Sequence, residues 1–153
     1  MKRKDGFTLI ELIIVLSIIL IIAAIVVPSL HITERYALKA AAMELKSDIL
    51  YTKTKAVKDS KRYWMKIYKD SNLYFITSDA FGPHHKVVYL NEGIEIEEAV
   101  FSTDNTIKFT IKGTTGSGGR ICLRSKHFRV KITVVPATGR VKIYSIEKIK
   151  TNH

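Results

Sequence analysis

The chain has 153 residues, 25 lysines and arginines against 14 acidic residues, a formal net charge of +11 and one cysteine. This length leaves room for one folded core and excludes two full-sized domains. A lone cysteine, Cys122, excludes an intramolecular disulfide, so the fold relies on packing.

The first thirty residues combine a basic start with a long apolar run. Residues 2–4 are Lys-Arg-Lys, and from Leu12 to Val27 only Ser17 is not apolar. A helix over residues 7–30 would extend about 36 Å at roughly 1.5 Å per residue. This is enough to span the hydrocarbon core of a bilayer.

A glycine and an aromatic residue separate the basic start from the apolar run. Gly6 is followed by Phe7-Thr8-Leu9-Ile10-Glu11, which resembles the class III signal of type IV pilins and pseudopilins. The resemblance implies cleavage after Gly6 by a prepilin peptidase and N-methylation of Phe7. It divides the chain into a leader (1–6), a transmembrane and assembly helix (7–30) and an exported head (31–153).

Two alternatives fit the N-terminus less well. An ordinary secretory signal peptide has an apolar region of roughly 7 to 15 residues and is cut beyond it. An ordinary single-pass anchor leaves Glu11 unexplained, because a carboxylate inside the bilayer costs about 2.5 to 3.5 kcal/mol.

Glu11 is the only charged residue between Phe7 and Leu30. After cleavage, the new amino group of Phe7 would lie four residues before Glu11, on the same helical face. We expect Glu11 to pair with such an amine during assembly. The basic flank keeps the N-terminus in the cytoplasm and predicts export of the head, by the positive-inside rule.

Residues 29–58 are predicted to continue the helix with an amphipathic pattern. Its apolar stripe recurs every three or four residues: Leu38, Ala41, Leu45, Ile49, Thr52 and Ala56. Charged residues fall mostly off this stripe and are expected on the solvated side: Glu34, Lys39, Glu44, Lys46, Asp48, Lys53 and Lys55.

Beyond Asp59 the pattern becomes alternating, which predicts a mostly β head. Strands are expected at 63–68, 73–77, 86–90, 94–97, 106–111 and 120–123. The first two flank a turn and form a hairpin. In the strand at 106–111, Ile107, Phe109 and Ile111 are expected to point inward.

The glycine-rich segment 113–119 lacks the Gly-Lys-Ser/Thr ending of a phosphate-binding loop and leads into a strand. We therefore expect a flexible connection.

The clearest hairpin joins residues 128–134 to residues 140–146 through Pro136-Ala137-Thr138-Gly139. If Val135 pairs with Arg140, Thr133 faces Lys142 and Lys131 faces Tyr144. Ile132 and Val134 then oppose Ile143 and Val141 on the buried surface.

The head patterns Phe109 to Gly113, Gly119 to Leu123 and Gly139-Arg140-Val141 resemble the GspH/FimT family of pseudopilins and minor pilins. This resemblance implies an α+β fold, in which a long N-terminal helix packs on a mostly antiparallel two-sheet head. It implies as partners a prepilin peptidase, other pilins and an inner-membrane assembly platform.

No catalytic, metal or cofactor pattern is found. His84 and His85 are adjacent and cannot share a face of a regular element, and HExxH and CxxC patterns are absent. We expect the protein not to be an enzyme but, through Gly6, the substrate of one.

Basic residues crowd the last fifth of the chain. Between Arg120 and Lys150 nine basic residues stand against Glu147 alone. The candidate DNA contacts are Arg129, Lys131, Arg140, Lys142, Lys148 and Lys150.

DNA-uptake members of the FimT group carry a similar Gly-Arg-x-Arg motif. Here Gly139-Arg140-Val141-Lys142 ends in lysine, which keeps the charge but loses the planar donor fork. A generally basic composition would also explain the charge.

Two function hypotheses follow from these patterns. The first is a minor subunit that primes or caps a type II secretion pseudopilus or a type IV pilus. The second is a minor pilin that binds DNA during natural transformation.

Overall fold

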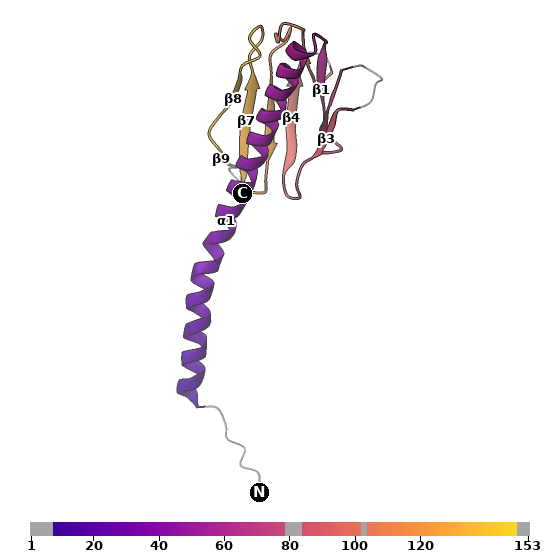
Figure 1. Ribbon diagram of the computed structural model, residues 1–153. Helices are drawn as coiled ribbons and strands as arrows, with labels where there is room; N and C mark the ends of the chain where they lie inside the picture. Colours follow the sequence, from indigo (N-terminus) through magenta and orange to yellow (C-terminus); the bar gives the residue numbers. More distant parts are fainter. Residues whose placement is uncertain (1–7, 79–83, 102–103, 150–153) are drawn as a thin grey trace. The chain divides into compact units, whose positions relative to one another are not determined.

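The computed structural model describes residues 8–78, 84–101 and 104–149, except the side chains of residues 25–31. The chain forms two compact units, residues 1–33 and 34–153. Helix α1 (Leu9–Lys58) belongs to both units (Figure 1). In the first unit it contains every described residue except Thr8, and in the second unit it is the first secondary-structure element.

Thr8 caps the start of α1. The backbone N–H of Glu11 lies 3.3 Å from Thr8 Oγ1 and 3.1 Å from its carbonyl oxygen, which satisfies a donor that the first turn leaves open. The large apolar side chains from Leu9 to Ile22 are exposed, as is Glu11. Among the described residues, no helix combines the length and apolarity needed to cross a membrane.

The second unit, which forms nearly all of the head, holds two antiparallel sheets beside the second half of α1. One has the strand order β3-β2-β1-β5 and the other β4-β6-β7-β8, with β9 also pairing with β7. The strands are β1 (Tyr63–Tyr68), β2 (Leu73–Thr77), β3 (Lys86–Tyr89), β4 (Glu95–Phe101), β5 (Thr106–Phe109), β6 (Gly119–Arg124), β7 (Phe128–Val134), β8 (Val141–Ile143) and β9 (Glu147–Lys148).

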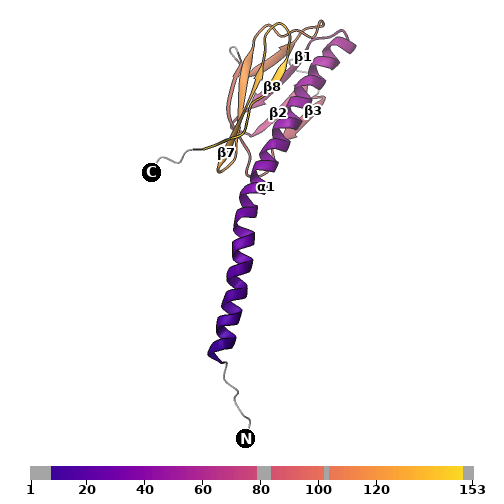
Figure 2. The ribbon, with the colours of Figure 1, turned by 90° about the vertical axis from the view of Figure 1, so that its left-hand side faces the viewer.

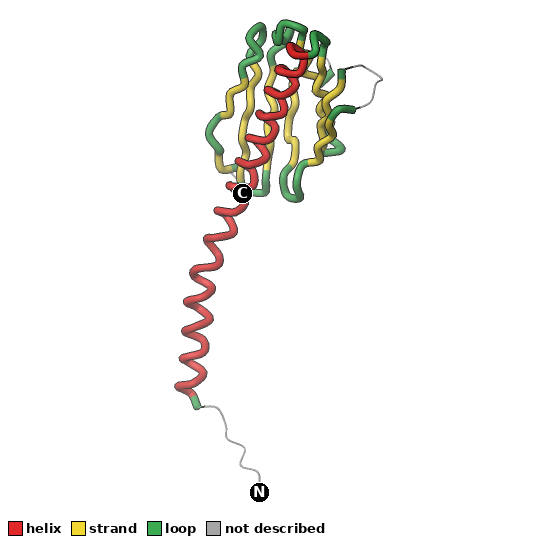
Figure 3. Tube along the Cα trace, in the orientation of Figure 1, coloured by secondary structure: helices red, strands yellow, loops and turns green. Residues whose placement is uncertain are grey.

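The second half of α1 lies along one side of the sheets, with the strands running roughly along it and loops at both ends (Figures 2 and 3). Five positions of its predicted stripe are buried, namely Leu38, Leu45, Ile49, Thr52 and Ala56, whereas Ala41 is only partly buried and its neighbour Ala42 is buried instead. The apolar side chains of this face pack in one core with the inner faces of both sheets. The predicted α+β fold is confirmed.

Asp48 was expected on the solvated side of α1, and that expectation is wrong. Its side chain is buried, with Oδ2 accepting a hydrogen bond from the Tyr74 hydroxyl at 2.7 Å. Both carboxylate oxygens also lie 2.7 Å from Lys86 Nζ. This carboxylate therefore joins α1 to β2 and β3.

Glu34 was also expected in solvent, but it binds the turn between β6 and β7. Its Oε1 accepts the backbone N–H of His127 at 2.8 Å, and its Oε2 lies 2.8 Å from His127 Nδ1. Burial by itself would raise the pKa of Glu34. Hydrogen bonds from the His127 side chain and backbone, with Ser125, outweigh burial and lower the pKa to about 2.

This contact predicts an acid-sensitive head. Glu34 titrates at its ordinary value of 4.5 when unfolded and near 2 when folded, so between these values the unfolded state binds more protons. The stabilisation is complete above about pH 4.5 and is lost as pH falls toward 2. In urea unfolding, Glu34→Gln should lose about 1.5 kcal/mol at pH 7 and much less near pH 2, whereas the exposed control Glu44→Gln should change little. An equal loss for Glu34→Gln at both pH values would contradict this.

A further expectation about the head is wrong. Ile111 was expected to point inward, but β5 ends at Phe109 and Ile111 is exposed, because a turn closes through Thr110 N–H and the Thr114 carbonyl oxygen at 2.9 Å. The glycine-rich segment connects β5 to β6, as expected. Within it, Thr115 is buried and bridges to Phe109, and Gly113 packs near Lys53 and Val57 of α1.

Asn72 fastens the two sheets to each other. Its side chain donates to the Ile94 carbonyl at 2.7 Å and accepts the Ile96 N–H at 2.9 Å. Asn72 has a positive φ of 51°, a conformation that asparagine tolerates better than most residues. Through this side chain, the β1–β2 turn provides the backbone hydrogen bonds that a neighbouring strand would otherwise provide at the start of β4.

Candidate functional site

The predicted register of the closing hairpin is confirmed. Thr133 pairs with Lys142, Ile132 with Ile143 and Val134 with Val141. The Tyr144 N–H continues the ladder to the Lys131 carbonyl oxygen at 2.8 Å. Lys131, Lys142 and Tyr144 therefore share the outer surface of the five-stranded sheet.

Strand pairing extends this surface across β6. Arg120 pairs with Thr133 and Arg124 with Arg129, so both arginines of β6 face the same side as the hairpin lysines. The surface, here called the outer basic face, comprises Arg120, Arg124, Arg129, Lys131, Arg140 and Lys142. The candidate residues had omitted Arg120 and Arg124, although the alternation of β6 already placed them together.

Carboxylates neutralise two of these cations. Glu98 accepts two hydrogen bonds from Arg120, at 3.0 Å from Nε and 2.7 Å from a terminal nitrogen, and these bonds lower the pKa of Glu98. Glu147 lies 3.3 Å from Arg129. Arg124, Lys131, Arg140 and Lys142 have no acidic partner within salt-bridge distance among the described residues.

Tyr144 lies between the two lysines of the hairpin. The Nζ atoms of Lys131 and Lys142 lie 5.4 Å and 4.7 Å from its ring centroid. A cation over an aromatic ring is attracted by its quadrupole, by about 0.5 to 1 kcal/mol at exposed sites. The ring therefore holds two positive charges close together on an open surface.

Gly139 shapes the turn that presents Arg140. Its φ is 60°, and an added Cβ would meet Phe109 at 3.0 Å and the Gly113 carbonyl oxygen at 3.1 Å. Lys53 Nζ of α1 donates to the Thr138 carbonyl at 2.8 Å and fixes the same turn. The geometry of the turn thus explains why glycine stands at position 139 of Gly139-Arg140-Val141-Lys142.

The remaining candidate residues do not join this surface. Lys148 pairs with Phe128 and so lies on the opposite side of the sheet from Arg129. Gly6, Phe7 and Lys150 lie outside the described residues. Glu11 is in the first turn of α1.

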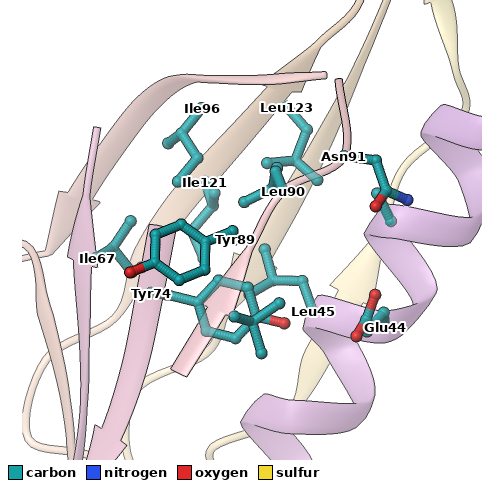
Figure 4. Close-up of a pocket in the computed structure, with 12 residues that line it drawn as sticks. Glu44, Leu45, Ile67, Tyr74, Tyr89, Leu90, Asn91, Ile96, Ile121 and Leu123 are labelled. Atoms are coloured by element: carbon teal, nitrogen blue, oxygen red, sulfur yellow. The ribbon is translucent and has the colours of Figure 1, made fainter. Parts of the chain in front are cut away.

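A pocket opens where α1 meets the two sheets (Figure 4). Its lining is mainly apolar, including Leu45 of α1, Ile67 of β1 and Ile121 and Leu123 of β6, with Glu44 and Asn91 as polar groups. The hydroxyl of Tyr74, another lining residue, already binds Asp48. Within the described ranges, no group of three or more His, Cys, Asp or Glu side chains is placed to hold a metal ion.

Comparison with known proteins gives two independent likenesses. Residues 1–27 match the prokaryotic N-terminal methylation motif. The fold matches the type IV minor pilin FimU of Pseudomonas aeruginosa, with a TM-score of 0.61 at 20% identity over 74% of this chain and 92% of FimU. The chain has a pilin-like fold.

Two more comparisons extend this likeness. The minor pseudopilin EpsH from the type 2 secretion system of Vibrio cholerae has a similar fold, with a TM-score of 0.57 at 13% identity over 71% of this chain and 96% of EpsH. Competence protein ComGD of Bacillus subtilis (strain 168) is 27% identical over 144 residues, which are 94% of this chain and 95% of ComGD.

Proposed function

We propose that this protein is a minor subunit that primes or caps assembly of a type II secretion pseudopilus or a type IV pilus. The observation that carries the proposal is the union of a methylation motif at residues 1–27 with a head of the minor pilin fold. A prepilin peptidase would cut after Gly6, and Phe7 would become the methylated terminus. Residues 7–30 would anchor the subunit in the inner membrane, with the N-terminus cytoplasmic and residues 31–153 exported.

The partners follow from this division of the chain. Other pilins would contact residues 7–30, and an inner-membrane assembly platform would load the subunit into the filament. Glu11 would pair with the Phe7 amine of its own chain or of a neighbour. An unpaired carboxylate there would be costly, by about 2.5 to 3.5 kcal/mol.

The test separates processing from incorporation. Glu11→Ala should be cleaved normally but recovered in sheared or cross-linked filaments at least tenfold less than the natural chain. Ser17→Ala is the matched control, because Ser17 is the one non-apolar residue from Leu12 to Val27 and its hydroxyl donates to the Ile13 carbonyl oxygen at 2.8 Å. Normal recovery of the Glu11 variant would refute the pairing, and failure of cleavage after Gly6 would refute the filament assignment.

A second function, DNA binding during transformation, is favoured by the outer basic face. Four of its six cations have no acidic partner among the described residues, and two of them flank an aromatic ring. Such a surface suits phosphate contacts. A relative named for competence, ComGD, supports the same proposal.

DNA binding is tested on residues 31–153, which contain every core residue of the head. The head should bind double-stranded DNA near 50 mM salt, and Arg140→Ala with Lys142→Ala should lower the slope of log K against log salt by about 2. The control is Lys148→Ala, which removes one positive charge from the opposite side of the sheet. No binding at low salt, or an equal effect of the control per charge removed, would remove this function.

A further inference from the structure

The second half of α1 carries a second apolar stripe, on the side away from the core. Four large apolar side chains recur every seventh residue and remain exposed to solvent. They are Tyr36 (66% exposed), Met43 (57%), Leu50 (38%) and Val57 (49%). None of the four belongs to the buried core of the described residues, and Val57 lies beside Gly113 of the loop after β5.

Small residues fill the positions between these four. Ala40, Ser47 and Thr54 are all exposed, so the combined stripe advances by alternate steps of four and three residues. This is the spacing of a heptad seam, in which large and small positions alternate along one helix face. We call residues 36, 40, 43, 47, 50, 54 and 57 the outer helix seam.

The outer helix seam lies almost opposite the buried stripe. Each of its positions except Val57 precedes a buried position by two residues, as Tyr36 precedes Leu38 and Met43 precedes Leu45. Two residues turn an α-helix by about 200°. The same helix therefore has one face in the core and another, largely apolar, that is exposed in the described part of the chain.

The geometry of the seam favours one kind of occupant. Alternating three- and four-residue ridges interlock with the ridges of another helix at a small crossing angle. A nucleic acid or a flat sheet face offers no matching repeat. Covering a large apolar side chain is favourable, because it removes apolar surface from water.

The charges beside the seam define the partner further. One flank is formed by Arg35, Lys39, Lys46 and Lys53, whereas the other carries the acid Glu44 together with Lys55 and Lys58. A second copy of this chain would bring the same excess of positive charge to the contact. An amphipathic helix with carboxylates beside its apolar stripe would instead place opposite charges along the basic flank.

We propose that the outer helix seam binds an amphipathic α-helix of another protein, one whose apolar stripe is flanked by acidic residues. This contact goes beyond assembly through residues 7–30, because it lies in the head and does not depend on which filament the subunit enters. It gives the subunit a way to select a neighbour by charge rather than to pair with itself.

The test uses residues 31–153 and two synthetic helical peptides about three to four heptads long. Both peptides have the same leucine and isoleucine stripe, but one is flanked by glutamate and the other by lysine. Fluorescence anisotropy should show that the glutamate peptide binds at least tenfold more tightly. Met43→Gln should weaken its binding at least fivefold, and Val87→Ser, on an exposed strand position, should not.

A charge exchange makes the test decisive. Replacing Lys39 and Lys46 with glutamate should reverse the preference, so that the lysine peptide binds more tightly. The proposal is overturned if neither peptide binds, if both bind equally, or if Met43→Gln has no effect. Self-association of the chain through this seam, seen by sedimentation and abolished by Met43→Gln, would overturn the charge argument and identify a second copy as the occupant.

Discussion

Gly119→Ala is expected to lower the free energy of unfolding by about 3 kcal/mol or more, at or beyond the upper end for overpacking. Gly119 begins β6 and pairs with Phe101 of β4. An added Cβ would clash with the Phe101 ring and with the Val100 carbonyl oxygen. Phe101 is fully buried, so relief requires moving a core side chain or separating two strands.

The loss is measured by urea unfolding of residues 31–153, followed through the fluorescence of Trp64, the only tryptophan. Gly116→Ala is the matched control, since no heavy atom lies within 4 Å of its added Cβ. The control should stay within about 0.5 kcal/mol of the natural chain. Similar stabilities for the two variants would show that β4 and β6 do not approach as described.

Asp48→Ala is expected to destabilise the head by about 2 to 3 kcal/mol, because a buried hydroxyl loses its acceptor. Tyr74 is buried, and burial together with its hydrogen bond to Asp48 raises the pKa of the hydroxyl well above its ordinary value, which keeps it a donor. The Lys86 side chain is 41% exposed and can turn to water. The loss should therefore be smaller than the roughly 3 to 5 kcal/mol that is lost when one partner of a fully buried ion pair is removed.

A double-mutant cycle isolates this contact. In a Tyr74→Phe background there is no hydroxyl that could lose its acceptor. Asp48→Ala should therefore lower the free energy of unfolding by at least about 1 kcal/mol less than in the natural chain. Lys86→Ala alone should have a smaller effect than Asp48→Ala. If Asp48→Ala costs the same in both backgrounds, the hydrogen bond is not the source of its stability.

Strands and register could be predicted because they depend on local alternation. In β7, Val130, Ile132 and Val134 alternate with charged or polar residues, and only one register buries them together with Val141. A slip by one residue would expose the whole set. The same reasoning identified the buried stripe of α1, where the helical period selects one face.

The roles of individual carboxylates could not be predicted in this way. Asp48 and Glu34 both lie off the predicted stripe, yet each binds residues far along the chain: Tyr74 and Lys86 for Asp48, and His127 for Glu34. A helical wheel cannot show which strand or turn packs beside the helix. The second seam of α1 was likewise hidden until the structure showed which face the core uses.

The sequence by itself determined the processing motif, the long helix, the two-sheet head and the sharing of one surface by Lys131, Lys142 and Tyr144. Only the tertiary structure decided which charges on that surface remain available. The register against β7 shifts by one residue between β8 and β9, and a shift of one residue exchanges the two faces of a strand. That shift places Glu147 opposite Arg129 and turns Lys148 to the other side, because strand pairing depends on contacts that no local pattern encodes.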